Sequence, residues 1–298
     1  ILVTSACSES IFSIYAALVK PGDHVIVEHP TYPSLYSVPR SLGCDVSLLT
    51  LKFEDNFKPD LDKLELLIKP NTRLISFTHP NNPTGSMISE ETLQRLIKIA
   101  ESGNIYFLLD ETYRELTYGE KLPPAASLSP KAISISSMSK CYGLPGIRIG
   151  WVASGSKEII DGVLAVREQV TITNNAVGEE IAFTVLNKKA HFIKRAKDHV
   201  KTNFDIVSAW MKMQENLEWI TPEAGVVSFP RIKPGITGEP ENLYRSLAEK
   251  HRTFVIPGRC FEMDNSHFRL GYGGTPDELK TGLKHLGSAL EEVKNKTA

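Results

Sequence analysis

Residues 105–113 read Ile-Tyr-Phe-Leu-Leu-Asp-Glu-Thr-Tyr, and this stretch decides the fold class. Its five leading apolar residues follow Gly103 and Asn104 and predict a short strand that is buried on both faces. Strands of this kind belong to parallel sheets that helices cover on both sides. The acidic pair Asp110-Glu111 predicts that the strand ends at a polar edge of such a sheet.

Similar short apolar runs lie on both sides of this strand, and helix-period segments separate them. The helices predicted for residues 8–19 and 89–102 each place their apolar residues on one stripe. This alternation is typical of βαβ units, and it predicts a mostly parallel sheet of class α/β. The other strands are predicted at residues 1–4, 24–28, 45–51, 73–78, 132–136 and 149–153.

The pattern becomes helical beyond about residue 157, with one long stretch to about Leu186 and another from His191 to Met213. Short strands follow, and Thr275-Pro276-Asp277-Glu278 is a capping box that predicts the start of a closing helix. We therefore expect a large α/β domain at residues 1–156, a connecting helical segment at residues 157–186 and a smaller α+β domain at residues 187–298.

Composition excludes several classes of partner. Apolar residues make up 41% and charged residues 23% of the 298 positions, as in ordinary globular proteins. Lys and Arg number 34 against 35 Asp and Glu, so the net charge of −1 provides no positive field for nucleic acid or an anionic membrane. No apolar run approaches the roughly 20 residues that cross a bilayer. We expect small molecules or protein as partners, with neither nucleic acid nor membrane.

The cysteines and histidines show no pattern of a disulfide framework or a metal site. The four cysteines are scattered without a Cys-x-x-Cys pair, in a chain long enough to fold without disulfides. We therefore expect a reducing, cytoplasmic location. The eight histidines have no metal-ligand spacing, so we expect no metal.

Polar residues follow almost every predicted strand. In open α/β sheets, ligands bind outside the carboxyl ends of the strands, so these residues together predict a binding site. They offer an anion site at a helix start, an aromatic ring, amide and phenol donors, a carboxylate, a lysine and an arginine. The segments are Ser5–Ser8, His29–Pro33, His79–Gly85, Asp110–Tyr113, and Ser136–Lys140 with Gly146–Arg148.

These residues resemble the class I/II aminotransferases, which are pyridoxal-phosphate-dependent enzymes of fold type I. The resemblance spans essentially all 298 residues and implies a homodimer with that fold: a mostly parallel sheet covered by helices, plus a smaller α+β C-terminal domain. Its specific parts are Asn82-Pro83-Thr84-Gly85, Asp110 with Tyr113, Ser137-x-Ser139-Lys140 with Arg148 eight residues on, and Phe268-Arg269-Leu270.

The resemblance implies roles in binding and using the cofactor, pyridoxal 5′-phosphate. Lys140 would form a Schiff base with its aldehyde and later carry the proton of the substrate. Asp110 would pair with the ring nitrogen and keep it protonated. Asn82 and Tyr113 would donate hydrogen bonds to the phenolate oxygen of the ring, and Tyr32 would stack on the face of the ring.

The resemblance also implies sites for two anions. The cofactor phosphate would be held by the backbone amides of Ala6, Cys7 and Ser8 at a helix start, by the Ser137 hydroxyl and by Arg148. The α-carboxylate of the substrate would be held by the guanidinium of Arg269, with Asn82 beside it in the substrate site.

Ordinary structural roles remain open for several of these residues. Lys140 could instead be a solvated surface lysine, although its place after a strand in an uncharged, Ser-rich run argues against that. The other residues have structural alternatives to their functional roles. These are a helix cap for Asp110 and Ser8, a turn for Asn82, a core or surface position for Tyr32, and an ion pair for Arg269.

Two features depart from the family pattern. The loop Thr4–Ser10 lacks the glycine that the family commonly has at the position of Ala6, which leaves its contacts with phosphate open. The chain also begins at Ile1 rather than Met, within a predicted strand, so we expect that residues are missing upstream. In the family, an N-terminal segment covers the substrate and supplies a tyrosine to the phosphate site of the partner subunit.

Three functions are compatible with the resemblance. The first is transfer of the α-amino group of an L-amino acid to a 2-oxo acid. The second is a lyase or cyclase reaction on the same fold, such as a C–S β-lyase, and residues 110–151 are also similar to capreomycidine-synthase-type enzymes, which cyclise a hydroxylated arginine. The third is an aminotransferase-like effector domain of a transcription regulator. Asp110, Lys140, Arg148 and Arg269 together favour catalysis, so we expect amino transfer.

Overall fold

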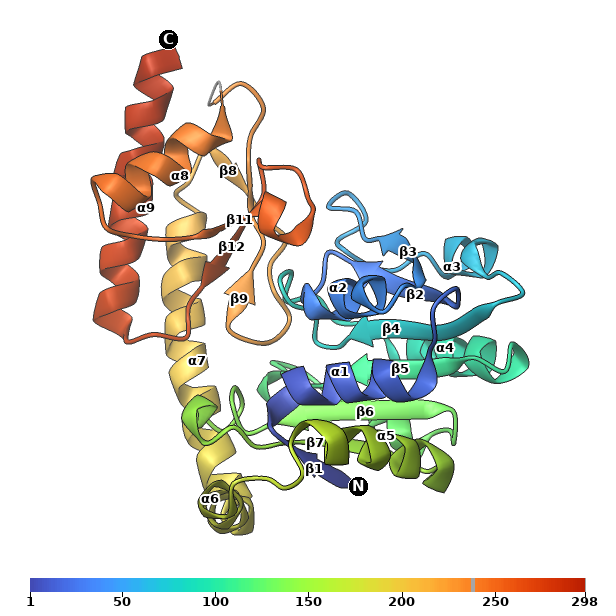
Figure 1. The fold of residues 1–298 in the computed structure, drawn as a ribbon. Helices are drawn as coiled ribbons and strands as arrows, with labels where there is room; N and C mark the ends of the chain where they lie inside the picture. Colours follow the sequence, from blue (N-terminus) through green and yellow to red (C-terminus); the bar gives the residue numbers. More distant parts are fainter. Residues whose placement is uncertain (237–238, 298) are drawn as a thin grey trace.

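A seven-stranded sheet forms the centre of the larger part of the molecule (Figure 1). The computed structural model describes residues 1–236 and 239–297. The strand order is β1-β7-β6-β5-β4-β2-β3; β3, β2, β4, β5 and β6 run parallel, and β7 is antiparallel to both β6 and β1. The prediction of a mostly parallel sheet is confirmed. The strands are β1 Leu2–Thr4, β2 His24–His29, β3 Asp45–Thr50, β4 Thr72–Thr78, β5 Tyr106–Asp110, β6 Ala132–Ser137 and β7 Gly150–Ser154.

Alternate residues of the central strands fill two cores, one on each face of the sheet. In β5, Leu108 points into one core while Phe107 and Leu109 point into the other. Helices cover both faces because neither face of the sheet is polar enough to meet water. One face is covered by α1 Ala6–Leu18, α2 Ser34–Ser41 and α5 Lys157–Val170, and the other by α3 Leu61–Leu67 and α4 Glu90–Ser102.

The prediction of one long helical stretch from residue 157 to Leu186 is wrong, because two helices occupy it. Helix α5 ends at Val170, and α6 spans Ala176–Asn187. The β-branched run from Thr171 to Thr173 disfavours the helix, and Ile172 adopts a positive φ of 62°. Asn175 then starts α6, since its side-chain oxygen accepts a hydrogen bond from the Gly178 amide at 2.8 Å.

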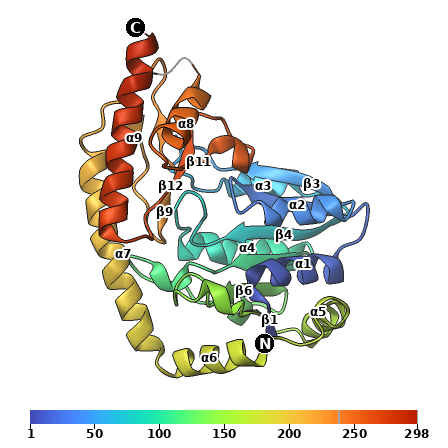
Figure 2. The ribbon, with the colours of Figure 1, turned by 60° about the vertical axis from the view of Figure 1, so that its left-hand side comes forward.

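The C-terminal part combines a long helix, small antiparallel strand pairs and two further helices. Helix α7 extends along one side of the molecule from the C-terminal part to α6 (Figures 1 and 2), and it packs with α8 and α9 around Leu243, Leu286 and Phe268. Strands β11, β12 and β9 form one sheet, and β10 pairs with β8. The bounds are α7 Lys189–Met211, β8 Leu217–Glu218, β9 Val227–Ser228, β10 Arg231–Ile232, α8 Pro240–Glu249, β11 Ile256–Pro257, β12 Phe268–Gly271 and α9 Pro276–Thr297.

Short 3-10 helices complete the fold and lie mainly in the loops after the central strands. They span η1 Arg114–Leu116, η2 Ala125–Ser127, η3 Pro145–Ile147 and η4 Gly258–Phe261. A search of the helices over residues 1–236 and 239–297 finds none that is both long and apolar enough to cross a membrane.

Candidate active site

A cavity of about 540 Å³ lies where the carboxyl ends of β4, β5 and β6 meet the sheet of β9, β11 and β12. Its volume is within the range of small-molecule sites. The residues that the sequence singled out come together here from seven separate segments of the chain. All of them line the cavity: Ala6, Cys7, Ser8, Tyr32, Asn82, Asp110, Tyr113, Ser137, Lys140, Arg148 and Arg269.

Asp110 is buried at the end of β5, next to Thr78 at the end of β4. Its carboxylate accepts a hydrogen bond from the Thr112 amide at 2.9 Å. Burial raises the pKa of Asp110 above its usual range, and the hydrogen bonds from Thr112 oppose this shift. The interpretation of Asp110 as a helix cap is wrong, because the next helix begins only at Arg114, with Tyr113 in the N-cap position.

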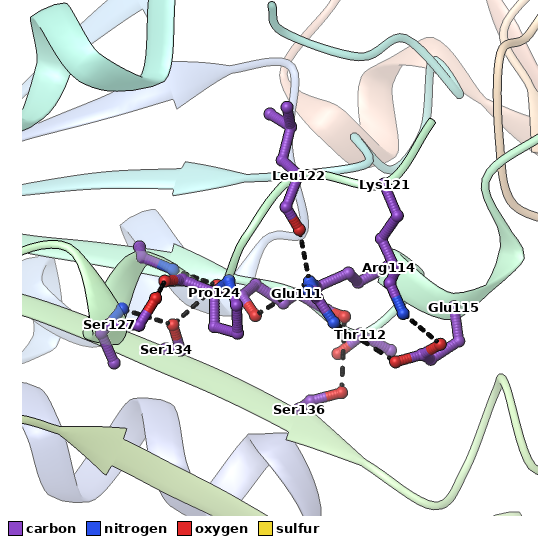
Figure 3. A network of polar contacts seen from close by, with 12 residues as sticks. Glu111, Thr112, Arg114, Glu115, Lys121, Leu122, Pro124, Ser127, Ser134 and Ser136 are labelled. Atoms are coloured by element: carbon purple, nitrogen blue, oxygen red, sulfur yellow. Dashed lines mark hydrogen bonds and ion pairs between the residues drawn. The ribbon is translucent and has the colours of Figure 1, made fainter. Parts of the chain in front are cut away.

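A polar network fixes the loop that follows Asp110 (Figure 3). The Glu111 carboxylate accepts hydrogen bonds from the Ser134 hydroxyl at 2.6 Å and from the Ala125 amide at 2.8 Å. Arg114 donates to the Leu122 carbonyl at 2.9 Å and also contacts Glu115. Because Glu111 directly follows β5 and Ser134 belongs to β6, this network joins the end of β5, where Asp110 lies, to the neighbouring strand.

Lys140 lies in the turn after β6, and its side chain is exposed to the open cavity. No hydrogen bond or ion pair joins its amine to another residue within the described chain. The neighbouring Ser139 hydroxyl is buried without a partner and also lines the cavity. Both groups are therefore available to a ligand.

The start of α1 forms a cradle for an anion. Ala6 is the first residue of this 13-residue helix and adopts a positive φ of 65°, which explains why a glycine would suit the position. The first amides of a helix have no partner within it and attract negative charge. Ser8 is the third helical residue, so it does not cap the helix. Ser137 and Arg148 line the same cavity and add a hydroxyl and a guanidinium to the donors.

Cys7 lines the cavity without the properties of a nucleophile. Its sulfur lies 3.1 Å from the Thr112 hydroxyl oxygen. Burial, with a smaller effect of the charge on Asp110, raises the pKa of the Cys7 thiol far above its usual range. The thiol therefore stays protonated at neutral pH.

Arg269 and Asn82 contact each other across the cavity. An Nη1 hydrogen of Arg269 is donated to the Asn82 Oδ1 at 3.0 Å, which leaves the amide NH₂ of Asn82 free to donate to a ligand. Arg269 has no ion pair among the residues described, so the interpretation as a structural ion pair is wrong. Asn82 also lies within a turn, which the Gly85 amide closes by donating to the Asn81 carbonyl at 2.9 Å and which the Asn81 side chain supports by accepting from the Thr84 amide and hydroxyl, at 3.1 and 2.7 Å. The turn interpretation of Asn82 therefore holds together with its place in the cavity.

Tyr113 is buried beside this pair, in the wall of the cavity. Burial raises the pKa of its phenol, while the positive charge on Arg269 opposes the shift. The phenol therefore remains a hydrogen-bond donor. Tyr32 also lines the cavity and is partly exposed, so it presents an aromatic face there rather than in the core.

Several lining residues were given no role from the sequence. Thr112 and Ser139 lie in the predicted segments Asp110–Tyr113 and Ser136–Lys140 without a role of their own, and Thr78 ends β4, so the rule that ligands bind at carboxyl edges could have found it. The wall on the C-terminal side gave no signal, because its strands are two to four residues long and too short for a periodic pattern. This wall includes Val226, Val227, Phe254, Val255, Ile256, Gly271 and Gly273.

The donor set of the cavity fits pyridoxal phosphate. A helix start, a hydroxyl and Arg148 suit a phosphate group, and the unpartnered Ser139 hydroxyl gives a further donor or acceptor. The buried carboxylate of Asp110 suits a protonated ring nitrogen, and the amine of Lys140 suits an aldehyde.

Comparisons with known proteins agree with this geometry. The family described as aminotransferase class I and II matches residues 1–286. Aspartate aminotransferase of Pyrococcus horikoshii is 28% identical, covering 99% of this chain and 76% of that protein. Capreomycidine synthase of Streptomyces vinaceus is 28% identical, covering 97% of this chain and 74% of that protein. A solved structure, a PLP-dependent aminotransferase from Streptococcus suis, matches with a TM-score of 0.92 at 31% identity, covering 98% of this chain and 76% of that one.

The family match covers nearly the whole chain, and the neighbouring structure shares both the large sheet and the C-terminal part. The chain therefore belongs to the class I and II aminotransferases, which are pyridoxal-phosphate-dependent enzymes of fold type I.

Proposed function

We propose that the chain transfers the α-amino group of an L-amino acid to a 2-oxo acid, with Lys140 as the residue that binds the cofactor and carries the proton. The observation that carries this proposal is the meeting of an unpaired lysine amine, a buried aspartate and an arginine without an ion pair, all within the described part of the chain, in one cavity. When bound, pyridoxal phosphate supplies an electron-withdrawing ring that stabilises negative charge at the substrate Cα.

The residues of the chain would bind the substrate and the cofactor, orient them and move the proton. Arg269 and Asn82 bind and orient the substrate carboxylate, which fixes the direction of the bonds at Cα. Once the substrate amine has replaced it on the cofactor, the freed amine of Lys140 would take the proton from the substrate Cα and return it at C4′ of the cofactor. Asp110 holds a positive charge on the ring nitrogen, and Asn82 and Tyr113 donate to the phenolate oxygen. Ala6–Ser8, Ser137 and Arg148 hold the phosphate.

The visible absorption spectrum of the purified chain with pyridoxal phosphate tests this function. We expect a band of the lysine-bound cofactor, and we expect an amino acid donor to convert it to the aminated form. A 2-oxo acid should then restore the band, because amino transfer consists of two half-reactions. If no amino acid produces the aminated form, the chain is not a transaminase.

The similarity to capreomycidine synthase favours a second candidate, a lyase or cyclase reaction in the same cavity. Such a reaction breaks another bond of the same bound substrate and returns the cofactor without amination. In the spectral experiment it would give a new product while the aminated form stays absent. Binding of an amino acid as a signal without any product would instead favour an effector domain of a transcription regulator.

Arg269→Lys is predicted to raise KM for the amino donor. Arginine holds a carboxylate through two parallel hydrogen bonds, whereas lysine offers a point charge on a shorter reach. Hydrogen bonds to charged groups contribute about 1.5–3 kcal/mol, so kcat/KM should fall roughly 10- to 100-fold. Steady-state kinetics measures the change, and Arg259→Lys is the matched control, since Arg259 pairs with Glu241 outside the cavity. An unchanged KM would contradict the role of Arg269.

We propose further that two copies of the chain associate through the region of α6. Figure 2 shows α6 standing apart from the sheet, between α5 and α7. Helix α6 exposes Val177 by 71% and Phe183 by 63%, and Ile172 just before it is also exposed. Exposed apolar residues clustered on one helix are typical of protein interfaces.

We also propose the division of the chain into three parts at residues 156 and 186. A cytoplasmic location is a further proposal, which the four free cysteines favour.

The double variant Val177→Glu/Phe183→Glu is predicted to be monomeric. Two buried charges without partners would oppose association, because desolvating a charge is costly. Analytical ultracentrifugation should give twice the 33.1 kDa mass for the unmodified chain and the single mass for the variant. Leu66→Glu is the control, since Leu66 on α3 is 85% exposed and lies outside α6. A monomeric unmodified chain would contradict the proposal.

A further inference from the structure

The C-terminal wall of the cavity presents apolar side chains directly beside Arg269. Ile256 of β11 is the residue opposite Arg269 of β12 in the antiparallel pair, so both side chains lie on the same face. Phe254 lies two residues before Ile256 and lines the same cavity. A carboxylate held by Arg269 would therefore have an apolar surface next to it.

This wall is not covered by the rest of the described chain. The side chain of Phe254 is 78% exposed and that of Ile256 is 36% exposed, although both line a cavity. Gly271, two residues after Arg269, has no atom within 4 Å of the place a Cβ would occupy, its chain neighbours aside. An open space bounded by apolar side chains thus continues from Arg269. Apolar surface of this kind gains stability when an apolar group covers it.

The charged residues of the cavity also favour an apolar group at this wall. Among the described residues that line it, the cations are Lys140, Arg148 and Arg269. The proposed function uses all three, for the aldehyde, the phosphate and the α-carboxylate. A second carboxylate on the substrate side chain would therefore find no further cation among these lining residues and would lose water against Phe254 and Ile256, which is unfavourable.

We propose that the amino donor carries a long apolar side chain, which packs on Phe254 and Ile256 while Arg269 holds its α-carboxylate. This inference rests on the proposed function and names its substrate class. Leucine, methionine and phenylalanine fit the wall, and aspartate and glutamate do not. The substrate class therefore differs from the one in the name of the aspartate aminotransferase relatives.

The preference is measured on the holoenzyme with one amino acid at a time and no 2-oxo acid. The spectral change gives an apparent Kd and a rate for alanine, leucine, phenylalanine, aspartate and glutamate. We expect leucine and phenylalanine to exceed alanine at least about tenfold in rate over Kd, and aspartate to fall below alanine. A higher value for aspartate or glutamate than for leucine overturns the substrate class while leaving amino transfer intact. If no amino acid changes the spectrum, the proposed function fails, and the inference fails with it.

Phe254→Ala tests the wall itself. The loss in rate over Kd should be about 10- to 100-fold for phenylalanine and leucine and under about threefold for alanine, which does not reach the ring. Because Phe254 is largely exposed, the truncation leaves the fold intact, and Leu66→Ala is the control for loss of an exposed apolar side chain. An equal loss for all amino acids would show a general defect and overturn the proposal. Phe254→Arg should raise the value for glutamate about tenfold, since it adds the missing cation.

Discussion

Lys140→Ala is expected to abolish the visible band of bound pyridoxal phosphate and to lower kcat by at least about 10³-fold. Alanine has no amine to bond with the aldehyde and none to carry the substrate proton. Loss of a positioned proton carrier alone lowers rates roughly 10²- to 10⁴-fold, and loss of the covalent bond to the cofactor adds to this. Among the described residues that line the cavity, Lys140 provides the side-chain amine.

Lys140→Arg separates the chemistry of the amine from its charge. Arginine keeps the positive charge but does not form the bond with an aldehyde, so it should be as inactive as alanine. Lys157→Ala removes an exposed lysine on α5, paired with Asp161 and outside the cavity, and should leave the band and kcat unchanged. The amine of Lys140 makes no contact within the described chain that would stabilise the fold, so the Tm of the cofactor-free chain should stay the same. Turnover by the alanine variant would contradict the proposed role.

The central sheet was predictable because burial on both faces imposes a pattern on the residues of each strand itself. A strand buried on both faces must be apolar at consecutive positions, and Phe107, Leu108 and Leu109 meet this requirement by filling opposite cores. The predicted strand at residues 105–109 and the observed β5 at Tyr106–Asp110 differ by one residue at each end. The polar residue that ends such a strand then lies at the carboxyl edge, which is how Asp110 was found.

The helical region between residues 157 and 211 was harder to predict because its breaks depend on single side chains. Nothing in the apolar pattern distinguishes Thr171–Asn175 from helix. The end of α5 depends on Ile172 at positive φ and on the Asn175 side chain capping α6. The sequence signal for a helix break was a β-branched run followed by two asparagines. Intrinsic helix propensities disfavour these residues only weakly, so they do not by themselves predict a break.

The candidate site likewise contains residues that the sequence predicts and residues that it does not. Residues at the carboxyl edge were predicted because sheet topology brings the ends of separate strands together. The apolar wall was not predicted, because Phe254 and Ile256 reach the cavity through the pairing of β11 with β12, strands of two and four residues.

Asp110→Asn is expected to lower kcat roughly 10²- to 10⁴-fold with little change in Tm. Removing one partner of a buried ion pair costs about 3–5 kcal/mol, and here the partner left unpaired is the protonated ring nitrogen of the bound cofactor. Asparagine keeps an oxygen that accepts the hydrogen bond from the Thr112 amide, so the loop after β5 is retained. Steady-state kinetics of the holoenzyme measures the loss of rate, and thermal unfolding of the cofactor-free chain measures the Tm.

A charge on the ring nitrogen is the property that this variant tests, and the control supplies that charge by another route. Pyridoxal phosphate methylated at the ring nitrogen is permanently positive, so it should restore part of the lost rate in Asp110→Asn. Glu111→Gln alters the adjacent buried carboxylate, which bonds Ser134 and Ala125 rather than facing the cavity, and its effect should appear in Tm. If Asp110→Asn keeps full activity, or if the methylated cofactor restores nothing, Asp110 does not hold the charge of the ring, and its burial serves only the packing at the end of β5.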